Sequence, residues 1–329
     1  MNTAYLRRTL VIAALGLTAN TPGWAAKVSM ESATAGSVTG LLPQAMAPIW
    51  SKAGVDVELA MGQTLTKSLL KLGQGGLDTS VIPPSAYADL IAGKGPYAQM
   101  GDKGKPIAEK TRALFGFTAS SYHVLVTVDS GISDWSKIKG KRVYIGPPAG
   151  AANAQITALV KRGSGYEAGK DYEGIKTPWG VATQSFQDGQ FDVHVLTGGT
   201  GSAVVTELSL ARKIRLLPLP PDAMPPADLG MAMGVIPKGT YKGVNDDADV
   251  PVWKTVMMFM AKKDLSDDVA YKLTKSYIES RKELAKGNAL LRDLPGDDPF
   301  IGVTAPLHPG AARYYKEAGI KIPAELMPR

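Results

Sequence analysis

The sequence predicts an α/β fold with two lobes, and three observations support this expectation. Short apolar runs rich in β-branched residues alternate with amphipathic helical segments, as in a mainly parallel sheet covered by helices. The chain has 329 residues, which exceeds the usual size of one domain. The two halves also share a pattern in which a glycine precedes an aspartate that enters a strand, at Gly76-Leu77-Asp78 and at Gly189-Gln190-Phe191-Asp192.

The first half of the chain is predicted to alternate strands and helices. Strands are expected over residues 27–31, 55–60 and 77–82. Helices should follow them, with their apolar faces within residues 41–50, 65–72 and 86–92. Residues 93–110 are rich in Gly, Lys and Pro, which indicates a solvated surface loop. Two strand-like segments, 113–117 and 122–128, complete this half.

The second half starts a similar series with the stretch 137–162. A strand is expected over 142–145, and the loop 146–152 must end it because proline cannot donate to a β-ladder. A helix follows from about Asn153, and its first N–H groups, at the positive end of the helix dipole, suit an anion. The remaining strands are predicted over 191–196, 214–219 and 230–236, and the remaining helices over 183–187 and 201–210.

A long helix is predicted near the C-terminus. Ser266 is a typical N-cap, Asp267 and Asp268 match the helix dipole, and Gly287 ends the helix. About 20 residues give a rod about 30 Å long, which is enough to brace two lobes. His308 is expected to cap a final short helix.

These elements suggest how the lobes divide the chain. Segment 230–236 could return the chain to the first lobe after the proline-rich connection 218–228. We therefore expect a discontinuous first lobe from residues 26–130 and 231–329, and a second lobe from residues 131–230.

Residues 1–25 resemble a secretory signal peptide. Arg7 and Arg8 form a basic start, residues 10–19 are apolar but too short to span a bilayer, and small residues precede a cleavage point after Ala25. A buried N-terminal helix is the alternative. We expect the mature protein to be exported.

Composition excludes several classes of function. The chain has no cysteine, which excludes disulfides, thiol catalysis and cysteine metal sites. The net charge is +7, and removal of Arg7 and Arg8 would leave +5 on the mature chain. The basic residues are scattered, so this balance mildly favours an acidic ligand and gives poor support for nucleic-acid binding.

No catalytic constellation is visible in the sequence. The loop 146–153 lacks the Gly-Lys-Ser/Thr of a phosphate-binding loop, and the dinucleotide, zinc-protease and nucleophile-elbow motifs are missing. His123, His194 and His308 are far apart, and each has a structural interpretation. We therefore expect no enzyme activity, no cofactor and no metal site.

Small or hydroxyl-bearing loops recur where a strand ends and a helix starts. In open α/β sheets ligands bind at the carboxyl ends of strands, so loops from both lobes should face one another across a ligand cleft. The ligand-binding candidates in these loops are Gly36, Ser37, Gln63, Thr64, Ser85, Ala149, Gly150, Ala151, Ala152, Asn153, Gly199 and Thr200.

The chain resembles the TAXI solute-binding proteins of TRAP transporters (tripartite ATP-independent periplasmic systems). The resemblance rests on 123–126 (HVLV), 129–132 (DSGI), 138–143 (IKGKRV), 146–148 (GPP), 187–192 (QDGQFD) and 308–315 (HPGAARYY). It implies a type II periplasmic-binding fold whose two lobes close on a ligand. It also implies a periplasmic location and a membrane permease driven by an ion gradient as partner. Family members tend to bind small organic acids such as glutamate.

The departures from the family pattern fall in the expected pocket. The family's Gly-Pro-Pro-Gly-Ser-Gly-Thr loop has no hydroxyl here, and its usual Gln after the third strand is Pro83. Each lost hydrogen bond to a charged group is worth roughly 1.5–3 kcal/mol, so a dicarboxylate ligand should bind less well. Trp179 and Gln184 join Gln63, Asn153 and Thr200 as candidates to replace these contacts. We expect a ligand with one anionic group and a less polar remainder.

Two other functions remain open at this point. The protein could be a periplasmic sensor that signals to a membrane receptor, or an enzyme on the same fold. A solute-binding protein without turnover is the leading interpretation. It is expected to be a monomer, without stable membrane insertion.

Overall fold

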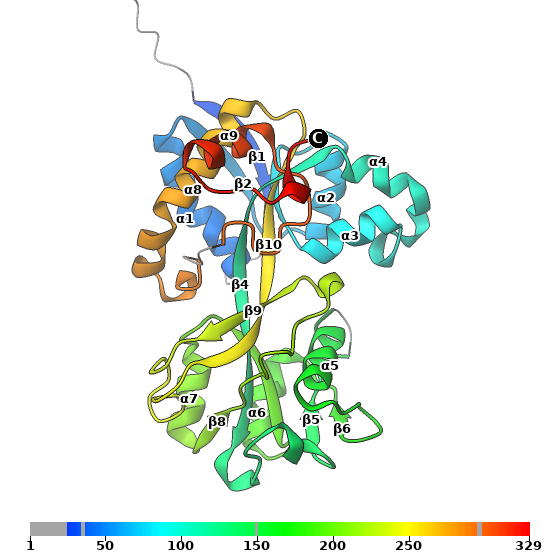
Figure 1. Cartoon of the computed structure of the whole chain (residues 1–329), viewed down its shortest axis with the longest axis vertical. Helices are drawn as coiled ribbons and strands as arrows, with labels where there is room; N and C mark the ends of the chain where they lie inside the picture. The colour runs from blue at the N-terminus through cyan, green and yellow to red at the C-terminus, as the bar shows by residue number, and fades with distance from the viewer. Residues whose placement is uncertain (1–24, 34–36, 149–150, 295–297) are drawn as a thin grey trace, which may run out of the picture.

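The protein consists of two α/β lobes stacked along its long axis, which confirms the predicted fold class (Figure 1). The computed structural model describes residues 25–33, 37–148, 151–294 and 298–329. The proposed signal segment up to Trp24, together with Gly36, Ala149 and Gly150 of the candidate site, lies outside these described residues.

The first lobe is built on a parallel set of strands in the order β2-β1-β3. The bounds are β1 Ala26–Glu31, β2 Val55–Ala60 and β3 Thr79–Ile82. Two longer strands, β10 (Val250–Lys262) and β4 (Thr111–Thr127), extend this set, with β10 antiparallel to β3. The helices are α1 Val38–Lys52, α2 Leu65–Gly73, α3 Pro84–Ala92, α4 Gly104–Ala108, α8 Asp267–Gly287 and α9 Pro309–Glu317.

The second lobe repeats this construction. Its parallel strands have the order β6-β5-β7, and β4 runs antiparallel to β7 as β10 does to β3. The bounds are β5 Arg142–Tyr144, β6 Glu173–Ile175, β7 Val193–Gly198, β8 Ile214–Leu216 and β9 Met231–Ile236. The helices are α5 Ala151–Ser164, α6 Trp179–Gln187 and α7 Ala203–Ala211.

Each lobe has its own hydrophobic core. Trp50 and Phe259 lie in the first core, whereas Phe191 and Trp253 lie in the second. The segment from β9 to the first half of β10 places Met231, Ile236, Tyr241 and Val250 in the second core. The chain thus returns to the first lobe within β10, later than the predicted boundary at residue 231.

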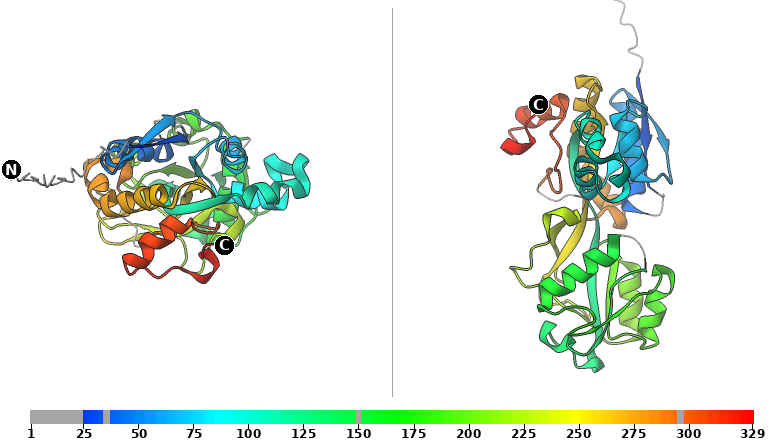
Figure 2. Two further views of the ribbon diagram at one scale, coloured as in Figure 1. Left: turned by 90° about the horizontal axis from the view of Figure 1, so that it is seen from above. Right: turned by 90° about the vertical axis from the view of Figure 1, so that its right-hand side faces the viewer.

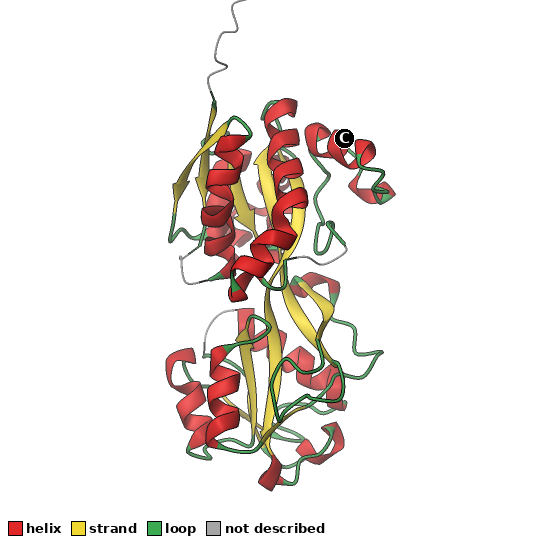
Figure 3. Ribbon diagram, turned by 90° about the vertical axis from the view of Figure 1, so that its left-hand side faces the viewer, coloured by secondary structure: helices red, strands yellow, loops and turns green. Residues whose placement is uncertain are grey.

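Strands β4 and β10 connect the lobes, and both pass through the waist of the molecule (Figure 2, Figure 3). The sequence analysis split β4 into two strands and did not anticipate β10. β4 has a polar middle, Ser120-Ser121, which lies between the two cores. The part of β10 in the first lobe, 256–261 (VMMFMA), is a continuous apolar run with no alternation, because both of its faces are covered.

The long helix α8 is present as predicted, with the Ser266 hydroxyl accepting a hydrogen bond from the Val269 N–H (3.2 Å). Its buried side chains, such as Leu273 and Tyr277, belong to the first core, so the long strands rather than this helix join the lobes. Within the described residues, no helix is both long enough and apolar enough to cross a membrane.

Two smaller expectations had different outcomes. Residues 93–110 are not an irregular loop, because they form the 3-10 segment η1 (Gly95–Lys103) and the short helix α4. His308 caps α9 as predicted, since its Nδ1 accepts a hydrogen bond from the Gly310 N–H at 3.2 Å.

Candidate functional site

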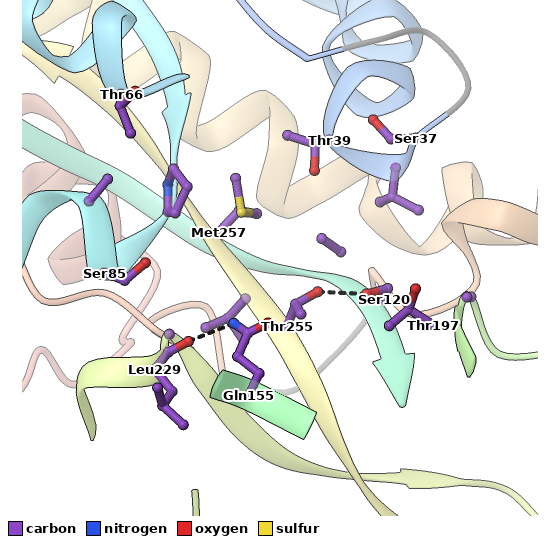
Figure 4. Close-up of a pocket in the computed structure, with 18 of the residues that line it drawn as sticks. Ser37, Thr39, Thr66, Ser85, Ser120, Gln155, Thr197, Leu229, Thr255 and Met257 are labelled. Carbon is purple, nitrogen blue, oxygen red and sulfur yellow. Dashed lines mark hydrogen bonds between the residues drawn. The ribbon is translucent and has the colours of Figure 1, made fainter. Parts of the chain in front are cut away.

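A cavity of about 700 Å³ lies between the two lobes. Its lining comes from α1, α2 and α3 of the first lobe, α5 and the end of β7 in the second lobe, and the crossing strands β4 and β10. Hydroxyl groups are the commonest polar groups in this lining (Figure 4), and they belong to Ser37, Thr39, Thr66, Ser85, Ser120, Thr197 and Thr255.

Two helices of the first lobe begin at the cavity. Ser37 is the N-cap of α1, where its hydroxyl accepts a hydrogen bond from the Gly40 N–H at 3.2 Å, and Thr39 follows in the first turn. Helix α3 starts with Pro84, and Ser85 is its second residue. The first N–H groups of a helix have no acceptor within that helix and lie at the positive end of its dipole. This wall can therefore receive a small anionic group.

The second lobe contributes a fixed amide to the opposite wall. The Gln155 Nε2 donates to the Leu229 carbonyl at 2.9 Å (Figure 4). Its Oε1 accepts from the Tyr122 hydroxyl at 2.7 Å. Because both ends of the amide are bonded, Gln155 is held in one orientation. Gly198 and Gly199, at the end of β7, complete this side.

The crossing strands meet at a β-bulge beside the cavity. The hydroxyls of Ser120 and Thr255 lie 2.7 Å apart across β4 and β10 (Figure 4). Thr255 is opposite Ser120, but Val256 is opposite Thr118, so Ala119 is an extra residue in β4. A bulge of this kind bends a strand and increases its twist. It places Ala119 in the lining, where the chain passes between the lobes.

Asp89 is the one charged side chain among the lining residues of the described chain. Its carboxylate has neither a hydrogen bond nor an ion pair with another described residue. The cavity thus offers hydroxyl groups and helix N-termini to an anion, without a cationic side chain from its described lining.

Two buried histidines lie outside this lining. His123 is fully buried, with its Nε2 2.7 Å from the Tyr241 hydroxyl and its Nδ1 3.2 Å from the Ser121 carbonyl. His194 lies among aromatic rings that include Tyr144 and Phe191. Burial lowers the pKa of each imidazole to about 4, so both are neutral at pH 7. In the part of the chain that the structure describes, no group of three His, Asp or Glu residues could hold a metal ion.

Most of the chain matches the model of one known protein family. A family model described as NMT1-like family matches residues 33–319. The chain belongs to the NMT1-like family.

Solved structures that resemble this NMT1-like protein are distant in sequence. The periplasmic aliphatic sulphonate binding protein from Escherichia coli is 14% identical, with 88% of this chain and 83% of that chain covered and a TM-score of 0.46. A periplasmic sulfonate-binding protein from Methylobacillus flagellatus KT is 12% identical, with 91% and 88% covered and a TM-score of 0.49. A TRAP periplasmic solute binding protein from Rhodobacter sphaeroides is 11% identical, with 88% and 92% covered and a TM-score of 0.45.

Among the predicted site residues that the structure describes, three line the cavity of this NMT1-like chain, namely Ser37, Ser85 and Gly199. Gln63 and Thr64 are exposed at the start of α2, and the Gln63 amide donates to the Met61 carbonyl. Thr200 is buried behind the lining.

The other predicted site residues lie elsewhere in the second lobe. The Asn153 amide donates to the Ile145 carbonyl at 2.6 Å and so ties the start of α5 to the end of β5. Trp179 packs edge-on against Tyr144, and Gln184 is exposed and donates to Asp188. Helix α5 begins at Ala151, and Ala152 is not among the residues that line the cavity.

Several lining residues were not predicted from the sequence. Thr39 and Gln155 lie only two residues beyond predicted site residues, at the first turns of α1 and α5, so a search extended by one helical turn could have found them. Ser120 and Thr255 had no such signal, because their position depends on where β4 and β10 cross.

Proposed function

We propose that this NMT1-like protein is a periplasmic solute-binding protein. It captures a small organic acid in the cavity between its lobes and delivers it to a membrane permease of the TRAP type. The cavity of about 700 Å³ is within the usual range for small-molecule sites, and both lobes line it. The family assignment, the signal-like residues 1–25 and the TAXI resemblance support the export and the permease.

The chemistry of the lining supports a ligand with one carboxylate and a less polar remainder. A carboxylate can accept hydrogen bonds from the N-terminal turns of α1 and α3 and from the Ser85 hydroxyl. A second carboxylate near Asp89 would meet a like charge without a cation to offset it. Apolar groups complete the lining, and they include Val38, Leu229, Val256, Met257 and Leu290.

The observation that supports this proposal best is a two-lobe cavity rich in hydroxyl groups, with Asp89 as its charged side chain. Native mass spectrometry of the purified protein tests it first, because a tightly held solute co-purifies and its mass is read directly. A thermal-shift comparison of matched monocarboxylates and dicarboxylates, such as butyrate and succinate, then tests the ligand class. We expect monocarboxylates to raise the melting temperature more. Stabilisation by glutamate or 2-oxoglutarate alone would contradict the proposed class.

A further inference from the structure

We infer that Asp293 is a positioning residue for the cavity: from the first lobe, it holds the loop of the second lobe that forms one cavity wall. This inference rests on the proposed function, because it concerns the same cavity. Asp293 does not itself line the cavity, so its influence on a solute must act through the residues it holds.

The backbone around Asp293 is fixed in the first lobe. Asp293 follows the 3-10 segment η5 (Ala289–Leu291), which comes shortly after α8. Its neighbours Leu291 and Leu294 are both buried in the first core. Any movement of the Asp293 backbone relative to the first lobe would disturb this packing.

The Asp293 carboxylate reaches into the second lobe. Its Oδ2 accepts a hydrogen bond from the backbone N–H of Thr200 at 3.1 Å, and its Oδ1 lies 3.0 Å from the Lys254 Nζ. Thr200 follows β7, and Lys254 lies where β10 pairs with Ser121 of β4, on the second-lobe side of the crossing. The Asp293 and Lys254 side chains are 11% and 12% exposed, so the ion pair is mostly shielded from water.

The same loop is held from its own lobe by Tyr241. The Tyr241 hydroxyl accepts hydrogen bonds from the N–H groups of Gly201 (3.0 Å) and Ser202 (2.9 Å), and Tyr241 is buried in the second core. Thr200 is thus held by the first lobe, whereas Gly201 and Ser202 are held by the second.

The residues on either side of these contacts reach the cavity. Gly198 and Gly199 line it directly before Thr200, and Leu290 lines it three residues before Asp293. Gly201 also lies beside the Arg292 side chain, since a Cβ atom added to it would be 2.7 Å from the Arg292 Nη1. The Asp293 contacts therefore set the position of this wall relative to the first-lobe helices that face it.

Two double variants separate the hydrogen bonds that the Asp293 carboxylate accepts from its ion pair with Lys254. These hydrogen bonds come from the Thr200 N–H and from the Ser121 hydroxyl, which lies 3.5 Å from the same Oδ2. Asp293→Asn with Lys254→Met removes both charges but keeps an oxygen that can accept from the Thr200 N–H. Asp293→Ala with Lys254→Met removes the charges and the acceptor. A matched control is Asp78→Asn with Lys262→Met, because that Lys–Asp pair (2.9 Å) lies within the first lobe.

The readouts require no ligand. The chain lacks cysteine, so K67C on α2 and R162C on α5, both at exposed positions, can be spin-labelled uniquely to measure the distance between the lobes. Amide hydrogen exchange reports the Thr200 N–H directly. In the Ala/Met variant we expect a broader interlobe distance distribution and exchange at Thr200 about tenfold faster or more, because the Thr200 N–H loses its hydrogen-bond acceptor altogether.

We expect the Asn/Met variant to retain wild-type distances and exchange, and the control to lower only the melting temperature. Unchanged distances and exchange in the Ala/Met variant would overturn the inference and leave Asp293 a structural residue. If that variant does not fold, amide hydrogen exchange of the wild-type protein provides the test. The Thr200 N–H should exchange as slowly as those of Gly201 and Ser202. Fast exchange at Thr200 would overturn the inference. Because no ligand enters these measurements, their failure is distinguishable from a failure of the proposed function.

Discussion

Asp78 and Asp192 occupy the same structural position in the two lobes. Each carboxylate accepts a hydrogen bond from a backbone N–H of the neighbouring parallel strand, Asp78 from Ser29 (2.8 Å) and Asp192 from Arg142 (2.9 Å). Each also pairs with a cation, Asp78 with Lys262 at 2.9 Å and Asp192 with Arg142 at 2.8 Å. The start of the third strand is thereby tied to the first strand in both lobes.

This relationship predicts an acid-sensitive contribution of Asp78 to stability. Burial raises the pKa of the Asp78 carboxyl, but hydrogen bonds from Lys262 and Ser29 outweigh burial and hold the pKa below its usual value. The stabilisation is therefore present above the unfolded pKa of about 4, and it is lost as the pH falls through the folded pKa. We expect Asp78→Asn to lower the free energy of unfolding by about 1–2 kcal/mol at pH 7. Urea unfolding at pH 7 and pH 3 measures this, and the difference between variant and wild type should shrink at pH 3.

A glycine precedes an aspartate that enters a strand in both halves, at Gly76-Leu77-Asp78 and at Gly189-Gln190-Phe191-Asp192. This pattern is visible in the sequence because it involves only neighbouring residues. It correctly indicated two lobes of like construction. Ser37, Ser85 and Gly199 were also predictable, since each follows a strand and opens a helix or its loop.

The crossing of strands β4 and β10 between the lobes could not be predicted from local sequence patterns. β10 pairs with β3, β4 and β9, which are separated from it by different lengths of chain, and only these long-range pairings place Thr255 at the cavity. Likewise, Asn153 and Gln155 both lie in the first turns of α5, but the Asn153 amide bonds to Ile145 whereas Gln155 lines the cavity. Sequence alone does not say which face of that helix meets the other lobe.

We predict that burial of a histidine makes the free energy of unfolding depend on pH between pH 7 and pH 5. Burial lowers the pKa of His194 to about 4, below the value of about 6.5 expected in the unfolded chain. The unfolded state binds the proton more readily, so this imidazole should lower the free energy of unfolding by about 2 kcal/mol between pH 7 and pH 5. His194→Leu should remove this share of the pH dependence, because an apolar group suits its aromatic surroundings.

Chemical denaturation of wild type and His194→Leu at the two pH values provides the measurement. His123 supplies a matched comparison, since burial also lowers its pKa to about 4 but its ring bonds to Tyr241. An identical loss of stability in wild type and His194→Leu would show that His194 does not titrate in this range.

Asp89 should determine the charge of the accepted solute. Asp89 lines the cavity, its carboxylate has no partner among the described residues, and at close range this charge disfavours a second carboxylate. We expect Asp89→Asn to improve dicarboxylate binding about tenfold, corresponding to about 1.4 kcal/mol, and to change monocarboxylate binding little. Calorimetric titration with butyrate and succinate measures both affinities. Asp102→Asn is the control, because Asp102 is exposed and is not in the lining.

Ala119 offers a test of the cavity that does not depend on charge. It is the extra residue of the β-bulge, it is only partly buried, and it lines the cavity beside the Ser120–Thr255 hydroxyl pair. Ala119 also packs against the first core, but a leucine there can extend into the cavity that Ala119 lines. We therefore expect Ala119→Leu to abolish co-purification of a solute in native mass spectra and to shift the free energy of unfolding by less than about 1 kcal/mol.

The control for this change is Ala211→Leu, at the exposed end of α7. It adds the same side chain far from the bulge, so it should leave solute occupancy and stability as they are in the wild type. If Ala119→Leu folds with normal stability and still retains the solute, the ligand must bind away from the crossing of β4 and β10. Ala119 and Thr255 lie where β4 and β10 pass from one lobe to the other. That result would therefore also show that the ligand does not bind at the strands that connect the lobes.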